Sequence, residues 1–288
     1  NKTVQNVILK DIKTALPNFI ENEKTNKKTG KKVLKTYSQN TIDKLYAMLK
    51  RGFKIAFSER IIQFNIMDNE NLKKPKAKKE LQKVEALSVE EQKKLVSILE
   101  NSTYKYRDII LLAIFTGMRI GEILAITNNN INLKDNTLKV ERTLTRNKRD
   151  EVILGSTTKT KKGKRTIYLS DNAISVLSRV MLSNNITNIY NLVFYDYEKN
   201  TFITPNEINC FLKRLNKKHK FCDHIHTHML RHTFATRCIE SGMSANVLKE
   251  ILGHEKIQTT LDTYTSVFEK FNKDENNKYN DYMKQIGM

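Results

Sequence analysis

A lysine-rich stretch early in the chain divides the sequence into two parts. Residues 71–83 hold six lysines and one proline and contain little that is apolar. A segment without an apolar pattern has nothing to bury in a core, so this stretch is interpreted as a linker. A chain of 288 residues is long enough to build two separate cores. We therefore expect one domain at 1–72, a basic linker at 73–85 and a second domain at 86–288.

The first domain is predicted to be a small helical bundle with a basic outer side. Apolar residues recur at helical spacing before Pro17 and again across 38–57, whereas residues 21–35 are polar and are interpreted as a loop. The apolar positions are Val4, Ile8, Ile12, Leu16, Ile42, Leu45, Leu49 and Phe53. The candidate DNA-binding cations on the other faces of the second helix are Lys44, Lys50, Arg51 and Lys54. In the linker, Lys74 and Lys76 either follow a phosphate backbone or belong to a solvated tether.

The second domain is predicted to be mainly α with one small antiparallel β-sheet. Ser88 to Glu91 resembles a capping box that opens a helix. The apolar run Ile109 to Phe115 indicates a buried helix, which Gly117 ends in a left-handed conformation. Residues 138–140 and 165–169 alternate as strands do, and the pattern is helical again from Asp171 onward.

The net charge of +20 is spread along the whole chain. The electrostatic field of such a charge favours a polyanionic partner, with nucleic acid first and an acidic membrane surface second. The alternative is that the charge only reflects a proteome rich in lysine. The longest apolar run, 109–115, is too short to span a bilayer, and no signal-peptide pattern opens the chain. Cys210, Cys222 and Cys238 have no paired spacing, which favours a reduced cytoplasm. Because the chain starts at Asn1, we expect a longer parent protein.

Basic, histidine and tyrosine residues in the C-terminal part suit an anionic substrate and a covalent step. Arg119 falls in the first turn of a helix, and Arg231 lies three residues after His228 on another. Two guanidinium groups can hold both non-bridging oxygens of a phosphodiester without a metal. Tyr264 is then the candidate nucleophile, and a cationic pocket would favour its ionised form. A lysine on a hairpin could protonate the leaving oxygen.

The order and spacing of these motifs resemble those of the tyrosine recombinases, the phage-type integrases, and most closely the integrases of conjugative transposons. The stretches that carry the resemblance are Thr116-Gly117-Met118-Arg119-Ile120-Gly121-Glu122, Lys159-Thr160-Lys161 with Arg165-Thr166-Ile167, His228-Met229-Leu230-Arg231-His232, Leu252-Gly253-His254 and Thr259 to Tyr264. The match covers residues 84–268 through specific motifs, and the helical N-terminal domain more weakly.

The resemblance assigns a role to each of these residues. It implies that Arg119 and Arg231 clamp the phosphate with His228 and His254, and that Glu122 supports Arg119. It makes Lys159 the general acid and Tyr264 the nucleophile. It further implies double-stranded DNA as substrate, a 3′-phosphotyrosine intermediate, no cofactor, and a homo-oligomer of two to four copies that recombines DNA through a four-way junction, with an excision factor as a possible partner. The location expected is the bacterial cytoplasm, at the nucleoid.

Three features depart from the family pattern. Ser266 stands where a histidine often follows the nucleophile, and Asn65-Ile66-Met67 lacks the usual proline. No arm-binding domain precedes residue 1, so this chain is expected to bind core sites only. The tail at 267–288 either packs onto a neighbouring protomer or is a mobile surface segment.

Other interpretations of the same residues stay open. His224, His226, His228 and His232 invite a metal site, which the missing ligand spacing disfavours; His232 is instead expected to be a packed histidine that supports its helix. Lys161 and Lys162 compete with Lys159 and are expected to contact backbone phosphates. Two other functions remain possible: a type IB topoisomerase, and a non-catalytic regulator whose helix-turn-helix would span 244–264.

Overall fold

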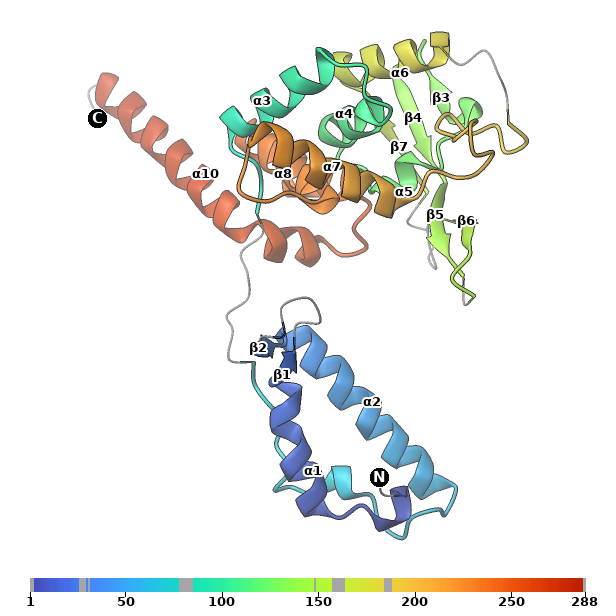
Figure 1. The fold of residues 1–288 in the computed structure, drawn as a ribbon. Coiled ribbons are helices and arrows are strands. Elements are labelled where there is room, and N and C mark those ends of the chain that lie inside the picture. The colour runs from blue at the N-terminus through green and yellow to red at the C-terminus, as the bar shows by residue number, and fades with distance from the viewer. Residues whose placement is uncertain are drawn as a thin grey trace. The chain divides into compact units, whose positions relative to one another are not determined.

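The computed structural model divides the chain into two compact units, Asn1–Lys83 and Val84–Met288, called unit 1 and unit 2 below. It describes residues 3–25, 30, 32–77, 85–147, 149–156, 164–183 and 188–286. Figure 1 shows both units with their elements labelled. Within these described ranges, no helix combines the length and the apolar character needed to cross a membrane.

Unit 1 is built on two helices, α1 (Leu9–Ala15) and α2 (Gln39–Ser58), with short 3₁₀ turns at Val4–Asn6, Leu16–Phe19 and Ile66–Asp68. The hydroxyl of Ser38 caps α2 by accepting from the backbone N–H of Thr41. The apolar side of α2 packs onto residues before and after it, and the buried residues of this core are Ile12, Leu16, Phe53, Ile66, Met67 and Leu72. The two predicted helices are therefore present, and the second lies where the sequence places it.

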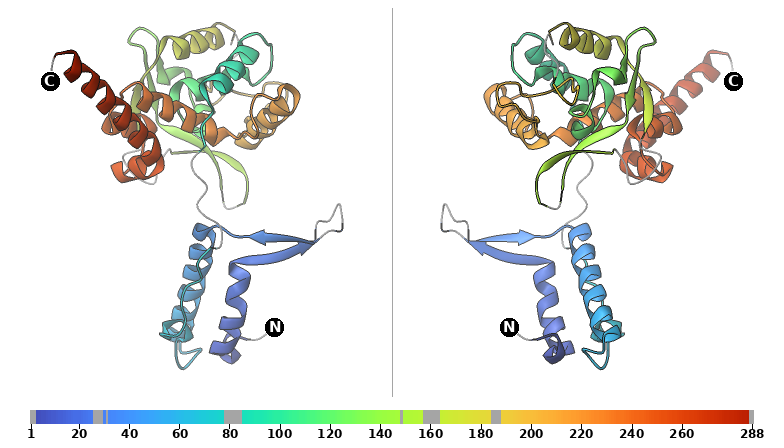
Figure 2. Two further views of the ribbon diagram at one scale, coloured as in Figure 1. Left: turned by 90° about the vertical axis from the view of Figure 1, so that its left-hand side faces the viewer. Right: turned by 90° about the vertical axis from the view of Figure 1, so that its right-hand side faces the viewer.

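The polar stretch between these helices is a β-hairpin, so the prediction of a loop at 21–35 is wrong. Strand β1 (Glu21–Thr25) pairs antiparallel with β2 (Lys32–Thr36). In Figure 2 this ribbon (blue) extends sideways from the two helices of unit 1. The loop was inferred from side-chain polarity, but a two-stranded ribbon is held by paired backbone groups, which polar side chains also allow.

Over its described residues, unit 2 is mainly helical with two small antiparallel sheets. The helices are α3 (Val89–Glu100), α4 (Arg107–Thr116), α5 (Ile120–Ile123), α6 (Asp171–Ser183), α7 (Pro205–His219), α8 (Thr227–Glu240), α9 (Ala245–Leu252) and α10 (Ile257–Gln285), with a 3₁₀ turn at Asn128–Asn130. One sheet has the order β3 (Ile131–Asn132), β4 (Thr137–Val140), β7 (Arg165–Tyr168). The other pairs β5 (Arg142–Arg146) with β6 (Val152–Ser156). The predicted fold class is therefore confirmed, with the β5–β6 hairpin as an addition.

Two predicted helix boundaries are confirmed in unit 2. Ser88 and Glu91 form a reciprocal capping box at the start of α3. Gly117 ends α4 with φ 62°, and a Cβ atom there would come within 2.3 Å of the Phe234 ring. Glycine at this position therefore serves both the left-handed turn and the close packing of α8.

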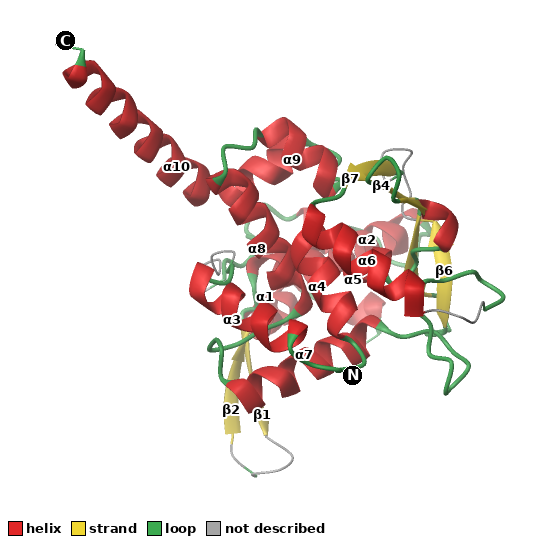
Figure 3. Ribbon diagram, turned by 90° about the horizontal axis from the view of Figure 1, so that it is seen from above, coloured by secondary structure: helices red, strands yellow, loops and turns green. Residues whose placement is uncertain are grey.

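The core of unit 2 surrounds α4, whose residues Ile109 to Ile114 are all buried. Helices α6 and α8 pack against α4, and α9 packs against β7, as Figure 3 shows from above. The left-handed residue Gly253 separates α9 from α10. Helix α10 is locally non-helical at Tyr264 (φ −117°, ψ 21°), and its C-terminal part projects away from the rest of unit 2.

Candidate active site

The first predicted arginine lies at the turn between α4 and α5. Since Gly117 ends α4, the chain turns sharply and Arg119 becomes the N-cap of α5, one residue before the predicted first turn. Its backbone N–H donates to Glu122 Oε2 at 3.0 Å, and its guanidinium Nη1 donates to Oε1 at 2.9 Å. Its side chain stays 43% exposed, so the remaining N–H groups of Arg119 are accessible to a ligand.

Glu122 is the centre of a buried ion network and not a support for Arg119 alone. Its side chain is 3% exposed and accepts from Arg165 Nη1 at 3.2 Å and Nη2 at 2.8 Å. Burial would raise the pKa of this carboxyl, but the bonds to Arg165 and the charges of both arginines outweigh it and lower the pKa. Glu122 is therefore an anion that holds two cations in fixed places.

Arg165 belongs to this site, although sequence reasoning gave it no role. Its Nε donates to the carbonyl of Ile251 at 2.7 Å, so it ties β7 to the end of α9. A Cβ atom at Gly253 would lie 2.8 Å from its Nη1. The signal was available in the strand alternation: Arg165 shares a face with Ile167 and Leu169, which point into the core, so it needed a buried partner.

Arg231 on α8 forms hydrogen bonds to the turn after α4 and to the end of α9. It is 5% exposed and donates from Nη1 to the carbonyl of Gly117 at 3.0 Å and from Nη2 to that of Leu252 at 2.6 Å. Burial, with the charge of Arg119, lowers its pKa to about 9, so it remains a cation at neutral pH. Arg119, His228 and Arg231 line one cavity of about 210 Å³, which suits an anion.

His254 follows the left-handed Gly253 and faces a different cavity. Its Nδ1 lies 2.8 Å from Thr260 Oγ1. Burial and the nearby arginines, Arg231 first, lower its pKa to about 4. The cavity has a volume of about 390 Å³ and is lined by Lys164, Arg165, Thr166, Lys249, Glu250, Gly253 and His254. His254 is therefore neutral at physiological pH and lies among cations.

The candidate nucleophile is buried in this structure. Tyr264 is 1% exposed, and its hydroxyl lies 2.9 Å from Nδ1 of His232. Burial raises the pKa of Tyr264 to about 12, while the charge of Arg231 lowers it only in part. The expectation that cations favour the ionised tyrosine is therefore wrong for this state, because desolvation outweighs the nearby charge.

The predicted lysines divide between described and undescribed parts of the chain. Lys159, Lys161 and Lys162 lie outside the described residues. In unit 1 the predicted cations are all exposed, and these are Lys44, Lys50, Arg51, Lys54, Lys74 and Lys76. Two of them pair with acids: Lys50 lies 4.0 Å from Asp68 and Lys74 lies 2.9 Å from Asp43.

The histidines considered as metal ligands are engaged in other contacts. His224 pairs with Glu85, and its ring stacks on that of His226 at 6.4 Å. Over the described ranges, no group of three or more histidine, cysteine or acidic side chains is arranged to hold a metal ion.

Known proteins resemble this chain over most of its length. A sequence model of the phage integrase family matches residues 85–270, well over half of the chain. The integrase of Staphylococcus phage L54a is 27% identical over 94% of this chain and 80% of its own length. The transposase of transposon Tn916 from Enterococcus faecalis is 28% identical over 79% of this chain and 58% of its own length. The chain thus spans only part of some of its relatives.

Solved structures share the fold. The Tn1549 transposon integrase in complex with transposon right-end DNA superposes with a TM-score of 0.72 at 23% identity, over 92% of this chain and 82% of that one. A lambda integrase dimer bound to a core site gives a TM-score of 0.59 at 18% identity, over 91% and 81%.

Proposed function

The chain belongs to the phage integrase family, and on that premise we propose that it cuts and rejoins double-stranded DNA through a phosphotyrosine intermediate. A site-specific recombinase of the transposon or phage type is the function that its relatives support. The observation that carries the proposal is the meeting of Arg119, His228 and Arg231 at one cavity, with Tyr264 within the electrostatic reach of Arg231. A tyrosine beside two phosphate-binding arginines is what metal-free strand cleavage requires.

The reaction is a transfer of one phosphodiester bond. The Tyr264 oxygen attacks the scissile phosphorus, a bond forms to the 3′ phosphate, and the bond to the 5′ oxygen breaks. Arg119 and Arg231 stabilise the charge that develops on the non-bridging oxygens, with His228 and His254 beside them. Lys159 gives a proton to the departing 5′ oxygen. Attack by another 5′ hydroxyl reverses the step, so the bond energy is kept.

Tyr264 has to become accessible to the scissile phosphate when the reaction begins, while its hydroxyl stays beside His232. Its hydroxyl is enclosed, whereas a phosphate would sit at the more exposed Arg119 and His228. The backbone of α10 is already non-helical at Tyr264, so the tyrosine can shift toward the phosphate beside His232 without unwinding a regular helix. The buried arrangement is thus the resting state before DNA binds.

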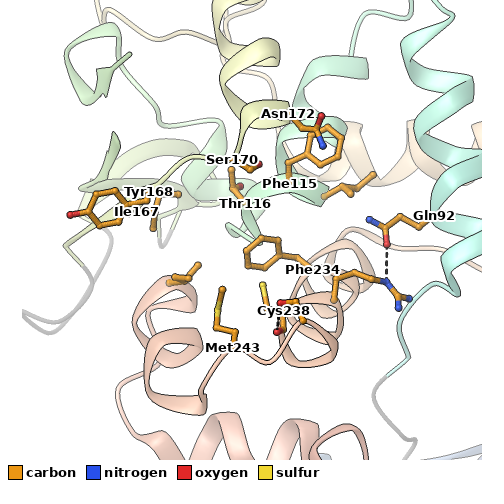
Figure 4. Close-up of a pocket in the computed structure, with 14 residues that line it drawn as sticks. Gln92, Phe115, Thr116, Ile167, Tyr168, Ser170, Asn172, Phe234, Cys238 and Met243 are labelled. Carbon is orange, nitrogen blue, oxygen red and sulfur yellow. Dashed lines mark hydrogen bonds between the residues drawn. The ribbon is translucent and has the colours of Figure 1, made fainter. Parts of the chain in front are cut away.

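We also propose that two to four copies act together on DNA. Tyr279, Tyr282 and Ile286 recur at helical spacing in the tail, and each is at least half exposed. Elsewhere in unit 2 a cavity of about 410 Å³ is lined by Phe115, Phe234, Cys238 and Met243 among others (Figure 4). The apolar stripe of one copy would fill this cavity in its neighbour. An excision factor and a place at the bacterial nucleoid would accompany this activity.

Two rival functions make different predictions. A type IB topoisomerase would form the same phosphotyrosine but relax supercoiled DNA as a monomer. A non-catalytic regulator would bind DNA through α9 and α10, two consecutive helices with the left-handed Gly253 between them. It would have no use for Arg231, whose burial needs two backbone carbonyls as partners.

The test is the capture of the covalent intermediate. A nicked duplex that carries a candidate element end is incubated with the protein in EDTA, and denaturing electrophoresis follows the protein–DNA adduct. We expect an adduct with the wild-type chain and none with Tyr264→Phe, while both bind the DNA. An adduct that persists in Tyr264→Phe would exclude Tyr264 as the nucleophile. Relaxation of supercoils without strand exchange between two sites would favour the topoisomerase.

A further inference from the structure

The nucleophile has one hydrogen-bond partner in the described part of the chain, and it is a histidine outside the predicted catalytic set. Nδ1 of His232 lies 2.9 Å from the Tyr264 hydroxyl, and the two rings meet edge to face with centroids 5.8 Å apart. Tyr264 is 1% exposed. Because bulk water scarcely reaches the hydroxyl, the proton that it must lose needs an acceptor within the protein or the substrate.

Among the described residues, no other basic side chain of the site forms a hydrogen bond with the Tyr264 hydroxyl. His228 lines the anion cavity, and its ring centroid lies 6.5 Å from that of His232. Nδ1 of His254 is bonded to Thr260. Arg231 offers only N–H donors, two of which bond to carbonyls. His232 is therefore the base already placed at the reacting oxygen.

The surroundings of His232 keep its imidazole neutral before DNA binds. The groups that act on it are His228 and Arg231 on the same helix and His226 just before it, while His254 lies near enough to be affected in turn. Tyr264 faces it from α10. Burial comes first, and the electrostatic effects of His228, Arg231 and His226 come next, in lowering the pKa of His232 to about 4. A neutral imidazole that carries its proton on Nε2 accepts at Nδ1 the bond that the protonated phenol donates.

We propose that His232 takes the phenolic proton of Tyr264 as the tyrosine attacks the scissile phosphate. This inference rests on the proposed strand cleavage. The proton passes from Oη to Nδ1 while the bond from Oη to phosphorus forms, and the electron pair of the breaking bond goes to the 5′ oxygen, which is protonated by a separate donor. The imidazolium then lies beside the phosphodiester anion, whose charge offsets that of Arg231. During rejoining the same proton returns to the tyrosine.

The charges around His232 make the proton transfer from Tyr264 depend on bound DNA. Without DNA, the imidazole is a weak base and the phenol is a weak acid, so the proton stays on the tyrosine. A bound phosphodiester adds a negative charge beside His228 and Arg231, and a nearby anion favours the protonated imidazole. The nucleophile is thus activated only when the site holds a phosphate.

The test separates a proton acceptor from a positioning contact. In His232→Asn, the side-chain oxygen can stand near the place of Nδ1 and still accept the hydrogen bond, but it cannot keep the proton. The rate of adduct formation on the nicked duplex is measured in single turnover between pH 6 and 10, with His232→Leu as the variant that loses both properties. We expect both variants to be slower at pH 7 by roughly 10²–10⁴-fold. We also expect their rates to rise with pH, as hydroxide replaces the base, while the wild-type rate levels off.

The rate of His232→Asn decides between a proton acceptor and a positioning contact. A His232→Asn rate within a few-fold of wild type, with only His232→Leu slow, would reduce His232 to a positioning role and overturn the inference. Wild-type DNA affinity in the variants shows that they are folded, and His232→Gln, with a larger side chain, serves if His232→Asn is not. If the wild-type chain itself forms no adduct on DNA that it binds, the proposed function fails, and this inference fails with it.

Discussion

The two units of the chain carry their positive charge in opposite ways. In unit 1 the cations of α2 are exposed, and an ion pair such as Lys50 with Asp68 is loose, at 4.0 Å and more than half exposed on both sides. In unit 2, Arg165 and Arg231 are 8% and 5% exposed, and each donates to oxygens at defined positions. The exposed cations of unit 1 contribute mainly an electrostatic field, whereas the buried arginines of unit 2 hold fixed positions.

This difference predicts how each unit responds to substitution. An exposed pair contributes about 0–1 kcal/mol, because water solvates either partner when the other is removed. A buried pair that loses one partner leaves an unsolvated charge, which costs about 3–5 kcal/mol. The cations of unit 1 should therefore act by their number, whereas those of unit 2 should act by their position.

The largest expected effect is that of Glu122→Gln. The variant leaves Arg165 buried without its anion and frees the Arg119 side chain, so we expect unit 2 to lose about 3–5 kcal/mol of stability. We also expect the adduct rate to fall by about 10²-fold or more, because the phosphate clamp is no longer held in place. Urea denaturation of the full chain and the adduct assay measure the two effects.

Glu240→Gln provides the matched control. Glu240 pairs with Arg237 on the surface of α8, and its side chain is 46% exposed. Its loss should cost no more than about 1 kcal/mol and leave the adduct rate unchanged. Equal losses of stability and of adduct rate in Glu122→Gln and Glu240→Gln would contradict the distinction between exposed charges and buried, positioned ones.

We also expect the stability of unit 2, but not that of unit 1, to depend on pH above the range in which carboxylates titrate. All six histidines follow residue 218, so unit 1 has none. His232 and His254 have folded pKa values of about 4, below the unfolded value of about 6.5. The unfolded chain therefore binds more protons between these values. The stability that their neutral forms contribute is complete above about pH 6.5 and is lost as the pH falls toward 4.

Hydrogen exchange on the full chain can follow both units at once. Peptides from α8 should lose protection between pH 6.5 and 4, after correction for intrinsic exchange, by up to about 1.4 kcal/mol per pH unit for each histidine. Peptides from α2 should change little until the carboxylates titrate. The variant with His232→Asn and His254→Gln should flatten the α8 response. A parallel loss in both units would show that the histidines are not its source.

The same contrast explains how much of the site could be predicted from the sequence. His228 and Arg231 lie three residues apart on one helix, so their shared position followed from local order, whereas the approach of Arg119, far earlier in the chain, was implied by the family resemblance. Arg165 was missed because its partner Glu122 is 43 residues away, and only the tertiary fold brings them together. The state of Tyr264 was predicted wrongly because burial, which outweighs the effect of Arg231, is not visible in a motif.

The fold shows the same limit. Helices α2 and α3 were predictable because an apolar period follows a capping serine, and α4 because a buried apolar run ends at a glycine. The β1–β2 hairpin was not, because its ten paired residues form a ladder of backbone bonds and carry no apolar alternation that marks one buried face. Local agreement in the sequence, rather than the size of an element, decided which parts were predicted.

The smallest expected effect is that of single cations on α2. Lys50→Gln or Lys54→Gln should weaken DNA binding slightly and lower the slope of log affinity against log salt by about 0.9 for each phosphate that the protein no longer neutralises. The double variant should lower it by about twice that amount, because exposed charges act additively. Lys134→Gln, an exposed lysine in the turn before β4, is the control that should leave the slope unchanged. A large loss of affinity from one α2 lysine, with no change in salt slope, would mean that this side chain acts by position, as the arginines of unit 2 do.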